Sequence, residues 1–105
     1  RATTFYTQIL AEPLHLMEMG EYKMSVLPCD MEGAGGCVTN DKNMTPSDKG
    51  TMVYLNVEGK LDEVVGRVEG AGGAVVLPRT SIGEHGFIAV IRDTEGNAVG
   101  LHSSK

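Results

Sequence analysis

The stretch that decides the fold is HGFIAVIRDTEG at residues 85–96, because YKMSVLPCDMEG at residues 22–33 matches it at an offset of 63. Both stretches carry a strand-like apolar run followed by Asp-x-Glu-Gly, which is typical of a turn between two strands. Repeated segments indicate repeated structural units, and equivalent copies must carry equivalent elements. The sequence therefore predicts two copies of one folding unit.

A more conspicuous repeat, EGAGG at 32–36 and again at 69–73, relates unlike elements. The later copy ends a stretch with four apolar residues at helical spacing, Leu61, Val64, Val65 and Val68, so it is predicted to be a helix C-terminus. The earlier copy follows a strand-like run and precedes Cys37. We therefore expect a hairpin turn there, in which Gly33 is equivalent to Gly96.

Outward from these anchors, each unit is predicted to have the order βαβββ. In the second unit we expect a strand, a helix and three strands over 51–57, 61–71, 74–77, 86–93 and 97–103. In the first we expect a helix over 2–11, with Phe5, Tyr6 and Ile9 inward, and strands over 14–17, 22–28 and 35–39. Its matching first strand is missing, so we expect about ten further residues, a strand and a turn, upstream of Arg1.

The length of 105 residues is that of a single domain. The first unit covers about 1–40 and the second about 51–105. Between them, the polar stretch at 40–50 has no apolar period and is predicted to be a linker.

Composition excludes several classes of protein. A net charge of −5 without any basic cluster disfavours nucleic acid as a partner. The longest apolar run, at 74–78, is too short for a membrane span, and no secretory segment follows Arg1, so we expect a cytoplasmic protein. Cys29 and Cys37 lack metal-binding spacing and are expected to be reduced thiols.

Four segments together resemble the vicinal oxygen chelate superfamily, which contains glyoxalase I, bleomycin-resistance proteins and extradiol dioxygenases. They are RATTFYTQIL at 1–10, GTMVYLNV at 50–57, LDEVVGRVEGAGG at 61–73 and GFIAVIRDTEGNAVGLHS at 86–103. The most specific part is D-x-E-G-N-x-x-G-L combined with the upstream AGG. The resemblance covers nearly the whole chain and implies an α+β fold in which two βαβββ units form a half-barrel cleft for a ligand.

The resemblance also implies where a metal would bind. Metal enzymes of the superfamily carry His, Gln or Glu on the first and fourth strands of each unit. Met52 stands at the His position, Gly100 at the second-unit Glu position and Cys37 at its symmetry mate, while the fourth position falls on the missing strand. Glycine offers no donor, so we expect no metal and no other cofactor. A zinc ion held by Cys37 and His102 would have an incomplete set of ligands.

The period of two along a strand predicts which side chains face the cleft. Val53, Leu55, Val57, Val99 and Leu101 are expected to pack on the helices. The candidate ligand-binding residues are Met52, Tyr54, Asn56, His102 and Cys37. His102 is either a general base or a structural residue at a strand end, and Tyr54 and Asn56 either hold a ligand or fill the cleft.

The leading hypothesis is a metal-free protein, similar to glyoxalase and bleomycin-resistance proteins, that binds a small, largely apolar or aromatic molecule in the cleft. One alternative is a glyoxalase-like, metal-dependent lyase or isomerase, and another is a dimeric scaffold without a ligand, so enzyme activity stays open. We expect a homodimer, with or without exchange of units, because an open sheet edge favours pairing.

Overall fold

The computed structural model describes residues 1–19, 22–28, 35–40 and 44–105, so the expectations for the Gly33 turn and for Cys29 fall outside it. Within these ranges the chain forms two α-helices, seven strands and one 3₁₀ turn. They are α1 (Ala2–Leu10), β1 (His15–Met19), β2 (Tyr22–Val26), β3 (Cys37–Thr39), β4 (Tyr54–Asn56), α2 (Leu61–Val68), β5 (Ala74–Ser81), η1 (Gly83–His85), β6 (Phe87–Arg92) and β7 (Ala98–Ser103).

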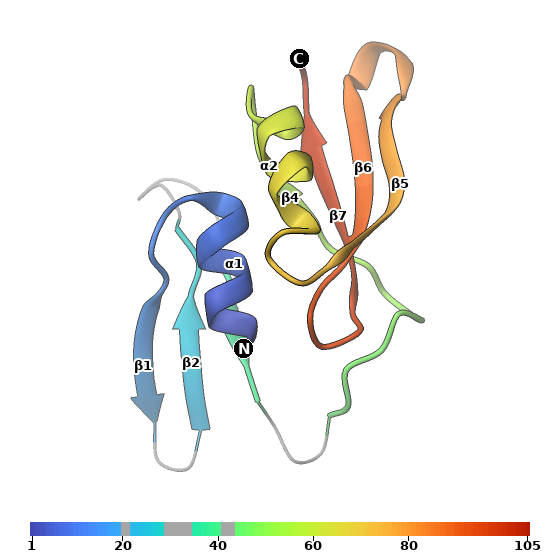
Figure 1. Cartoon of the computed structure of the whole chain (residues 1–105). Coiled ribbons are helices and arrows are strands. Elements are labelled where there is room, and N and C mark those ends of the chain that lie inside the picture. The colour runs from blue at the N-terminus through green and yellow to red at the C-terminus, as the bar shows by residue number, and fades with distance from the viewer. Residues whose placement is uncertain (20–21, 29–34, 41–43) are drawn as a thin grey trace.

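The strands form two sheets within the described residues, and the fold is α+β as predicted. The first sheet has the antiparallel order β1-β2-β3, and the second has the order β4-β7-β6-β5, with β4 parallel to β7. In Figure 1 each helix lies across its own sheet and the two helices adjoin each other. A parallel β4 and β7 require a crossover, which α2 and the following antiparallel strands supply.

The register refines the internal repeat. Buried Ser25 pairs with Val38 in the first sheet, and buried Ala89 pairs with Leu101 in the second. The offset is therefore 63 between β3 and β7 but 64 between β2 and β6. The predicted match of residues between β2 and β6 is therefore wrong by one position. An offset of 63 would match buried Ser25 with Ile88, which lies on the other face of its sheet from Ala89.

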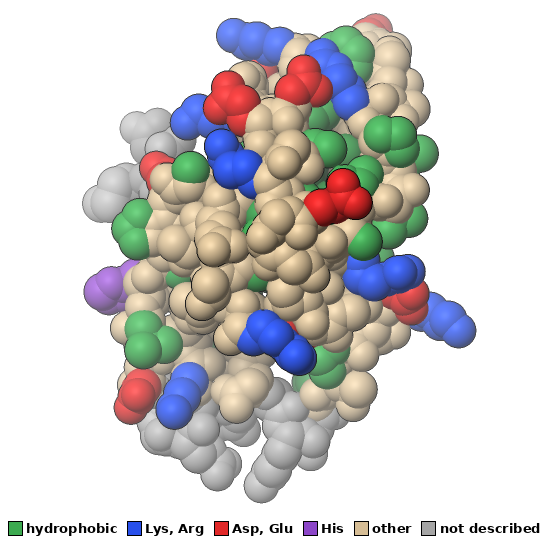
Figure 2. Space-filling view, viewed as in Figure 1, with side chains coloured by type: hydrophobic (Ala, Val, Ile, Leu, Met, Phe, Trp, Pro, Cys, Tyr) green, Lys and Arg blue, Asp and Glu red, His purple; other side chains and the backbone are tan. Residues whose placement is uncertain are grey.

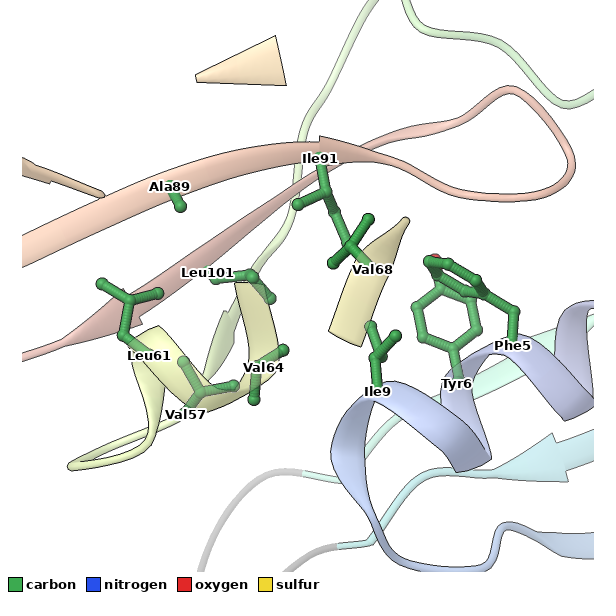
Figure 3. Packing of buried hydrophobic residues seen from close by; sticks show 10 residues of the cluster. All are labelled: Phe5, Tyr6, Ile9, Val57, Leu61, Val64, Val68, Ala89, Ile91 and Leu101. Atoms are coloured by element: carbon green, nitrogen blue, oxygen red, sulfur yellow. The ribbon is translucent and has the colours of Figure 1, made fainter. Parts of the chain in front are cut away.

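One continuous core joins the two units. Figure 3 shows α1 and α2 presenting their apolar faces to each other, with β6 and β7 beside α2. The predicted inward residues of α1 and most of those of α2 are confirmed as buried. The cluster comprises Phe5, Tyr6, Ile9, Val57, Leu61, Val64, Val68, Ala89, Ile91 and Leu101. Each fully buried large side chain contributes about 1.5–3 kcal/mol, so this cluster is the main source of stability.

Gly72 and Gly73 end α2, and Gly73 also leaves room for a side chain of α1. The amide of Gly73 donates to the carbonyl of Val68 at 3.0 Å and that of Gly72 to Glu69 at 3.1 Å, with φ of +101° at Gly72. This is a Schellman ending, as the AGG stretch predicts. A Cβ at Gly73 would lie 2.6 Å from the Phe5 ring and 2.6 Å from the carbonyl oxygen of Arg92. Gly73 therefore sets how closely α1 approaches the second unit.

A buried carboxylate ties the units together. Asp93 is only 6% exposed, and its Oδ2 accepts from the Tyr6 hydroxyl at 2.7 Å and from Asn97 Nδ2 at 3.1 Å. Its Oδ1 accepts from the amides of Glu95 and Asn97, both at 2.9 Å. Asn97 Oδ1 in turn accepts from the amide of Ser47 at 2.9 Å. The sequence predicts a turn at Asp93 and Asn97, and the structure adds helix α1 and the linker to it.

Two side chains at and beside this junction, Tyr6 and Glu95, have shifted pKa values. Burial, and then the hydrogen bond to Asp93, raises the pKa of Tyr6 well above its ordinary value. Nearby, Arg1 Nε donates to Glu95 Oε2 at 2.8 Å on the surface, and this hydrogen bond is the largest cause that lowers the pKa of Glu95 to about 2. Tyr6 therefore keeps its hydroxyl proton in the folded protein, where this proton forms the hydrogen bond to Asp93.

The first strand of the second unit departs from the prediction. The strand covers Tyr54–Asn56, with one backbone bond to β7 from each flanking residue, Val53 and Val57, rather than all of 51–57. Val57 is buried as expected, but Val53 is 63% exposed, so its predicted packing on a helix is wrong. The reason is that β4 is an edge strand of its sheet, and the side chain of Val53 borders a groove rather than a neighbouring element.

The surface carries mixed charge. On the face shown in Figure 2, acidic and basic side chains are interspersed, and apolar side chains gather at the edge that β5 occupies in Figure 1. Neither described helix has the length and apolar content needed to cross a membrane.

We predict that Gly73→Ala destabilises the protein by about 1–3 kcal/mol, because the added methyl group overlaps the Phe5 ring and the Arg92 carbonyl. Urea denaturation followed by circular dichroism measures the change. Gly66→Ala is the matched control, because Gly66 lies in α2 with open space around its Cα, and it should stabilise by about 0.5–1 kcal/mol. Equal effects of the two substitutions would contradict the assigned role of Gly73.

We predict that Tyr6→Phe costs about 1.5–3 kcal/mol at pH 7, because it removes a buried hydrogen bond to a carboxylate. A raised folded-state pKa means that the stability from Tyr6 is fully present below the unfolded pKa of about 10 and is lost as the pH rises above it. The variant should therefore show a shallower loss of stability above pH 10. Tyr54→Phe is the control, and an identical alkaline profile in both variants would contradict the prediction.

Candidate functional site

The face of the second sheet that turns away from α2 is the strongest candidate surface. Because paired residues share a face, the register defines two rows that cross all four strands, and a third, Ala74, Arg92 and Ala98, that crosses three. The opposite face carries core residues Ala89, Ile91 and Leu101. We call the two rows together the open face: an apolar row of Leu77, Val90, Gly100 and Tyr54, and a mixed row of Thr80, Ile88, His102 and Asn56.

Tyr54 and Gly100 form one packed unit in the apolar row. They are partners in the parallel pairing of β4 with β7, and a Cβ at Gly100 would overlap the Tyr54 ring. The glycine is buried beneath the ring, while Tyr54 itself is 45% exposed. An aromatic side chain that covers a neighbouring glycine protects that stretch of backbone and presents its outer ring surface to solvent. Tyr54 therefore supplies an exposed aromatic surface on the open face.

The mixed row holds hydrogen-bonding side chains in fixed orientations. His102 Nε2 lies 2.8 Å from the carbonyl oxygen of His85, which only accepts, so Nε2 carries the proton. Asn56 Oδ1 accepts from the amide of Glu58 at 3.0 Å. These contacts fix both side chains and leave His102 Nδ1 and Asn56 Nδ2 as the groups with no partner among the described residues.

The first sheet has a corresponding face turned away from α1. Ser25 of β2 bonds Thr3 of α1 through its hydroxyl at 2.6 Å, so the neighbouring positions of β2 point to the other side. That side includes Met24 and Val26, both half-buried, and Met17, which is 43% exposed. Cys37 is also on this side, where its thiol is exposed and forms no disulfide with any described residue.

A groove of about 1010 Å³ separates the two sheets. It is bordered by β3 and the end of β2 on one side and by β4 on the other, with parts of α1 and α2 beneath. Three of the sequence-predicted ligand residues border it, namely Tyr54, Asn56 and Cys37. Met52, which is half-buried ahead of β4, and His102 do not. The structure thus places three candidates at the groove, His102 on the open face and Met52 on neither, and their binding role stays a prediction.

The central residues of the open face are not among the sequence-predicted site residues. The sequence predicts strands at Leu77, Ile88 and Val90 but no role for their side chains. The alternation in FIAVIR contains the signal, because Ala89 and Ile91 are in the core and Ile88 and Val90 must then point outward. In β5, two irregularities in the pairing with β6 interrupt the alternation, so alternation alone does not predict which face Leu77 occupies.

The residues present do not fit the metal site that the resemblance implies. Gly100 has no donor atom, and the Tyr54 ring fills the space that a carboxylate side chain at position 100 would enter. Within the described ranges, no three His, Cys, Asp or Glu side chains gather closely enough to hold a metal ion. These residues therefore do not form a metal site of that kind.

Comparison with solved structures identifies the fold. A glyoxalase/bleomycin resistance protein from Albidiferax ferrireducens matches with a TM-score of 0.72 and 14% identity, covering 96% of this chain and 85% of that protein. A glyoxalase/bleomycin resistance/dioxygenase domain from Frankia matches with a TM-score of 0.66 and 23% identity, covering 99% and 87%. A fosfomycin resistance protein from Listeria monocytogenes matches with a TM-score of 0.66 and 14% identity, covering 98% and 81%.

These similarities establish a glyoxalase-like fold, the fold that the resemblance of the sequence motifs implies. No protein-family model matches the chain, and no curated protein matches it in sequence. At such low identity the likeness concerns the fold, and function has to be argued from the residues of the site.

We predict that Gly100→Ala destabilises the protein by about 1–3 kcal/mol because its methyl group displaces the Tyr54 ring. In a Tyr54→Ala background the same substitution should cost less than about 0.5 kcal/mol. Chemical denaturation of the four proteins in a double-mutant cycle measures the coupling. Additive effects would show that the ring and the glycine do not depend on each other.

Proposed function

We propose that this chain, which has the glyoxalase-like fold, binds a small, largely apolar or aromatic molecule on the open face without using a metal ion. The observation that carries the proposal is the Tyr54 ring over Gly100. It removes the position of a carboxylate ligand and places an aromatic surface there instead. An aromatic ligand gains from stacking on such a ring by about 0.5–1.5 kcal/mol beyond the area that it buries.

The two rows of the open face supply complementary contacts. Leu77, Val90 and Tyr54 provide apolar area, and the row beside them provides hydrogen-bonding groups on His102 and Asn56. Mostly apolar surfaces with a few fixed polar groups are typical of small-molecule sites, where the polar groups orient the ligand. Because the contacts of His102 and Asn56 within the chain already fix these side chains, ordering them on binding costs little entropy.

A second copy of the chain is part of the proposal. Small-molecule sites bury most of the ligand surface, whereas one sheet face leaves the other side of a ligand in water. The face of the first sheet with Met17 and Met24 is also exposed and adaptable, since methionine repacks easily. A homodimer in which a sheet of the partner covers the open face, with or without exchange of units, would enclose the ligand.

We predict that the neutral aromatic dye N-phenyl-1-naphthylamine binds the protein saturably, and that Leu77→Asp weakens this binding at least about tenfold. Leu16→Asp should leave it within about twofold. Both leucines are exposed on edge strands, but Leu16 lies on the face of the first sheet that is turned toward α1. Fluorescence titration measures both affinities.

Equal losses in the two variants, or no saturable binding, would contradict the assignment of the open face. Metal analysis of the purified full-length protein tests the other part of the proposal. A stoichiometric divalent ion would favour the metal-dependent lyase or isomerase over metal-free binding.

A further inference from the structure

The open face carries a hydrogen-bond acceptor and a hydrogen-bond donor side by side. Asn56 and His102 are direct partners in the parallel pairing of β4 with β7, so their side chains leave neighbouring strands on the same face. His102 is half-buried and Asn56 is exposed. Both side chains can therefore reach a molecule that lies on the open face.

Contacts within the chain decide which role each side chain can take. His102 Nε2 donates to the carbonyl of His85 at 2.8 Å, so in the neutral ring Nδ1 carries no proton and can only accept. Asn56 Oδ1 accepts from the amide of Glu58 at 3.0 Å, which leaves Nδ2, a group that can only donate. The pair thus offers one fixed acceptor beside one fixed donor.

The spacing of the two strands suits a single oxygen atom between these groups. Neighbouring strands lie about 4.8 Å apart. An oxygen that makes two hydrogen bonds of about 2.9 Å at a tetrahedral angle joins two nitrogens about 4.7 Å apart. A hydroxyl donates through its proton and accepts through its lone pairs, so one hydroxyl can satisfy His102 Nδ1 and Asn56 Nδ2 together. A carbonyl or carboxylate oxygen only accepts and would leave Nδ1 facing a second acceptor.

The charges around the pair also favour a neutral group. Arg92, in the third row of this face, has its guanidinium paired with Asp48, at 3.0 Å between Nη2 and Oδ2. The Glu58 carboxylate, close to Asn56 in sequence, accepts from the amide of Ser104 at 2.7 Å and from its hydroxyl. The net charge of −5 repels anions from the chain as a whole. A neutral hydroxyl therefore suits this position better than an anionic oxygen.

The apolar row sets the body of the molecule that carries the hydroxyl. Residues two positions apart along a strand lie about 6.6 Å apart, and this distance separates the mixed row from the apolar row. A fused two-ring aromatic molecule held by its hydroxyl at Asn56 and His102 reaches across this distance to the exposed ring of Tyr54. Such a molecule combines both kinds of contact that the open face offers.

We propose that the ligands of the open face are neutral aromatic hydroxyl compounds of about two fused rings, whose hydroxyl donates to His102 Nδ1 and accepts from Asn56 Nδ2. The inference rests on the proposed function, because it names the class of molecule bound at the same surface. His102 and Asn56 select the hydroxyl, and the apolar row holds the rings.

Displacement of the dye N-phenyl-1-naphthylamine by 2-naphthol and by 2-methylnaphthalene tests the proposal. The two probes differ in a hydroxyl against a methyl group of similar size. At about pH 8, where phenols keep their proton, the ratio of their affinities should shift against 2-naphthol by about fivefold or more in Asn56→Leu and in His102→Phe. Each ratio compares two probes on one protein, so a general loss of affinity or stability cancels.

Asn40→Leu is the matched control. Asn40 is an exposed asparagine that directly follows β3 in the first unit, away from the open face. The ratio should stay within about twofold of that of the unmodified protein. Long-range ¹H–¹⁵N NMR spectra check the acceptor separately, and we expect a protonated Nε2 and an unprotonated Nδ1 in His102 of the free protein.

Four results would overturn the inference. The first is an unchanged ratio in both variants while Leu77→Asp still weakens dye binding, a result that leaves the proposed function intact. The second is a proton on His102 Nδ1 in the free protein, and the third is tighter binding of 2-naphthoate than of 2-naphthol. The fourth is saturable dye binding that 2-naphthol does not displace. Absence of saturable dye binding contradicts the proposed function itself, and this inference with it.

Discussion

The buried carboxylate of Asp93 is the constraint on which the arrangement of the two units depends. A carboxylate taken out of water is costly unless hydrogen bonds replace its hydration, and here four donors do so. Two of the donors are amides of its own turn, one is the side chain of Asn97, and one is the Tyr6 hydroxyl from the other unit. Only a docked α1 brings that hydroxyl into place, so the turn and the interface between the units are stabilised together.

Two close approaches explain how the sheets and helices fit around that junction. Because Gly73 has no side chain, the Phe5 ring can lie beside the backbone of β6. In the same way, Gly100 allows the Tyr54 ring to lie against the backbone of β7. In both places an aromatic ring occupies the volume of an absent Cβ. The glycine-rich composition therefore reflects packing as well as turns, and the two rings connect α1 and the edge strand β4 to the same sheet.

Local patterns in the sequence were sufficient for the fold, because helical spacing, strand alternation and turn residues act over a few positions. They predicted both helices, the order of elements along each unit and the inward position of Leu101 in β7, whereas the binding role of the positions on its other face stays a prediction. Interactions between distant residues could not be predicted in this way. Tyr6 and Asp93 lie 87 positions apart, and the one-residue slip between β2 and β6 becomes visible only through the pairing of Ser25. Gly100 was interpreted as a lost metal ligand, but its contact with Tyr54 gives a physical reason for it.

Tyr54 lies at the boundary between the open face and the groove, which makes the two surfaces interdependent. Because Val53 and Val57 bond β7, alternation directs the peptide groups of Tyr54 and Asn56 away from β7, toward the groove. The ring of Tyr54 meanwhile rests on Gly100 within the open face. A group bound in the groove would therefore contact the backbone of the residues whose side chains form one end of the open face. Tyr54 and Asn56 thus belong to both surfaces, the groove through their backbone and the open face through their side chains.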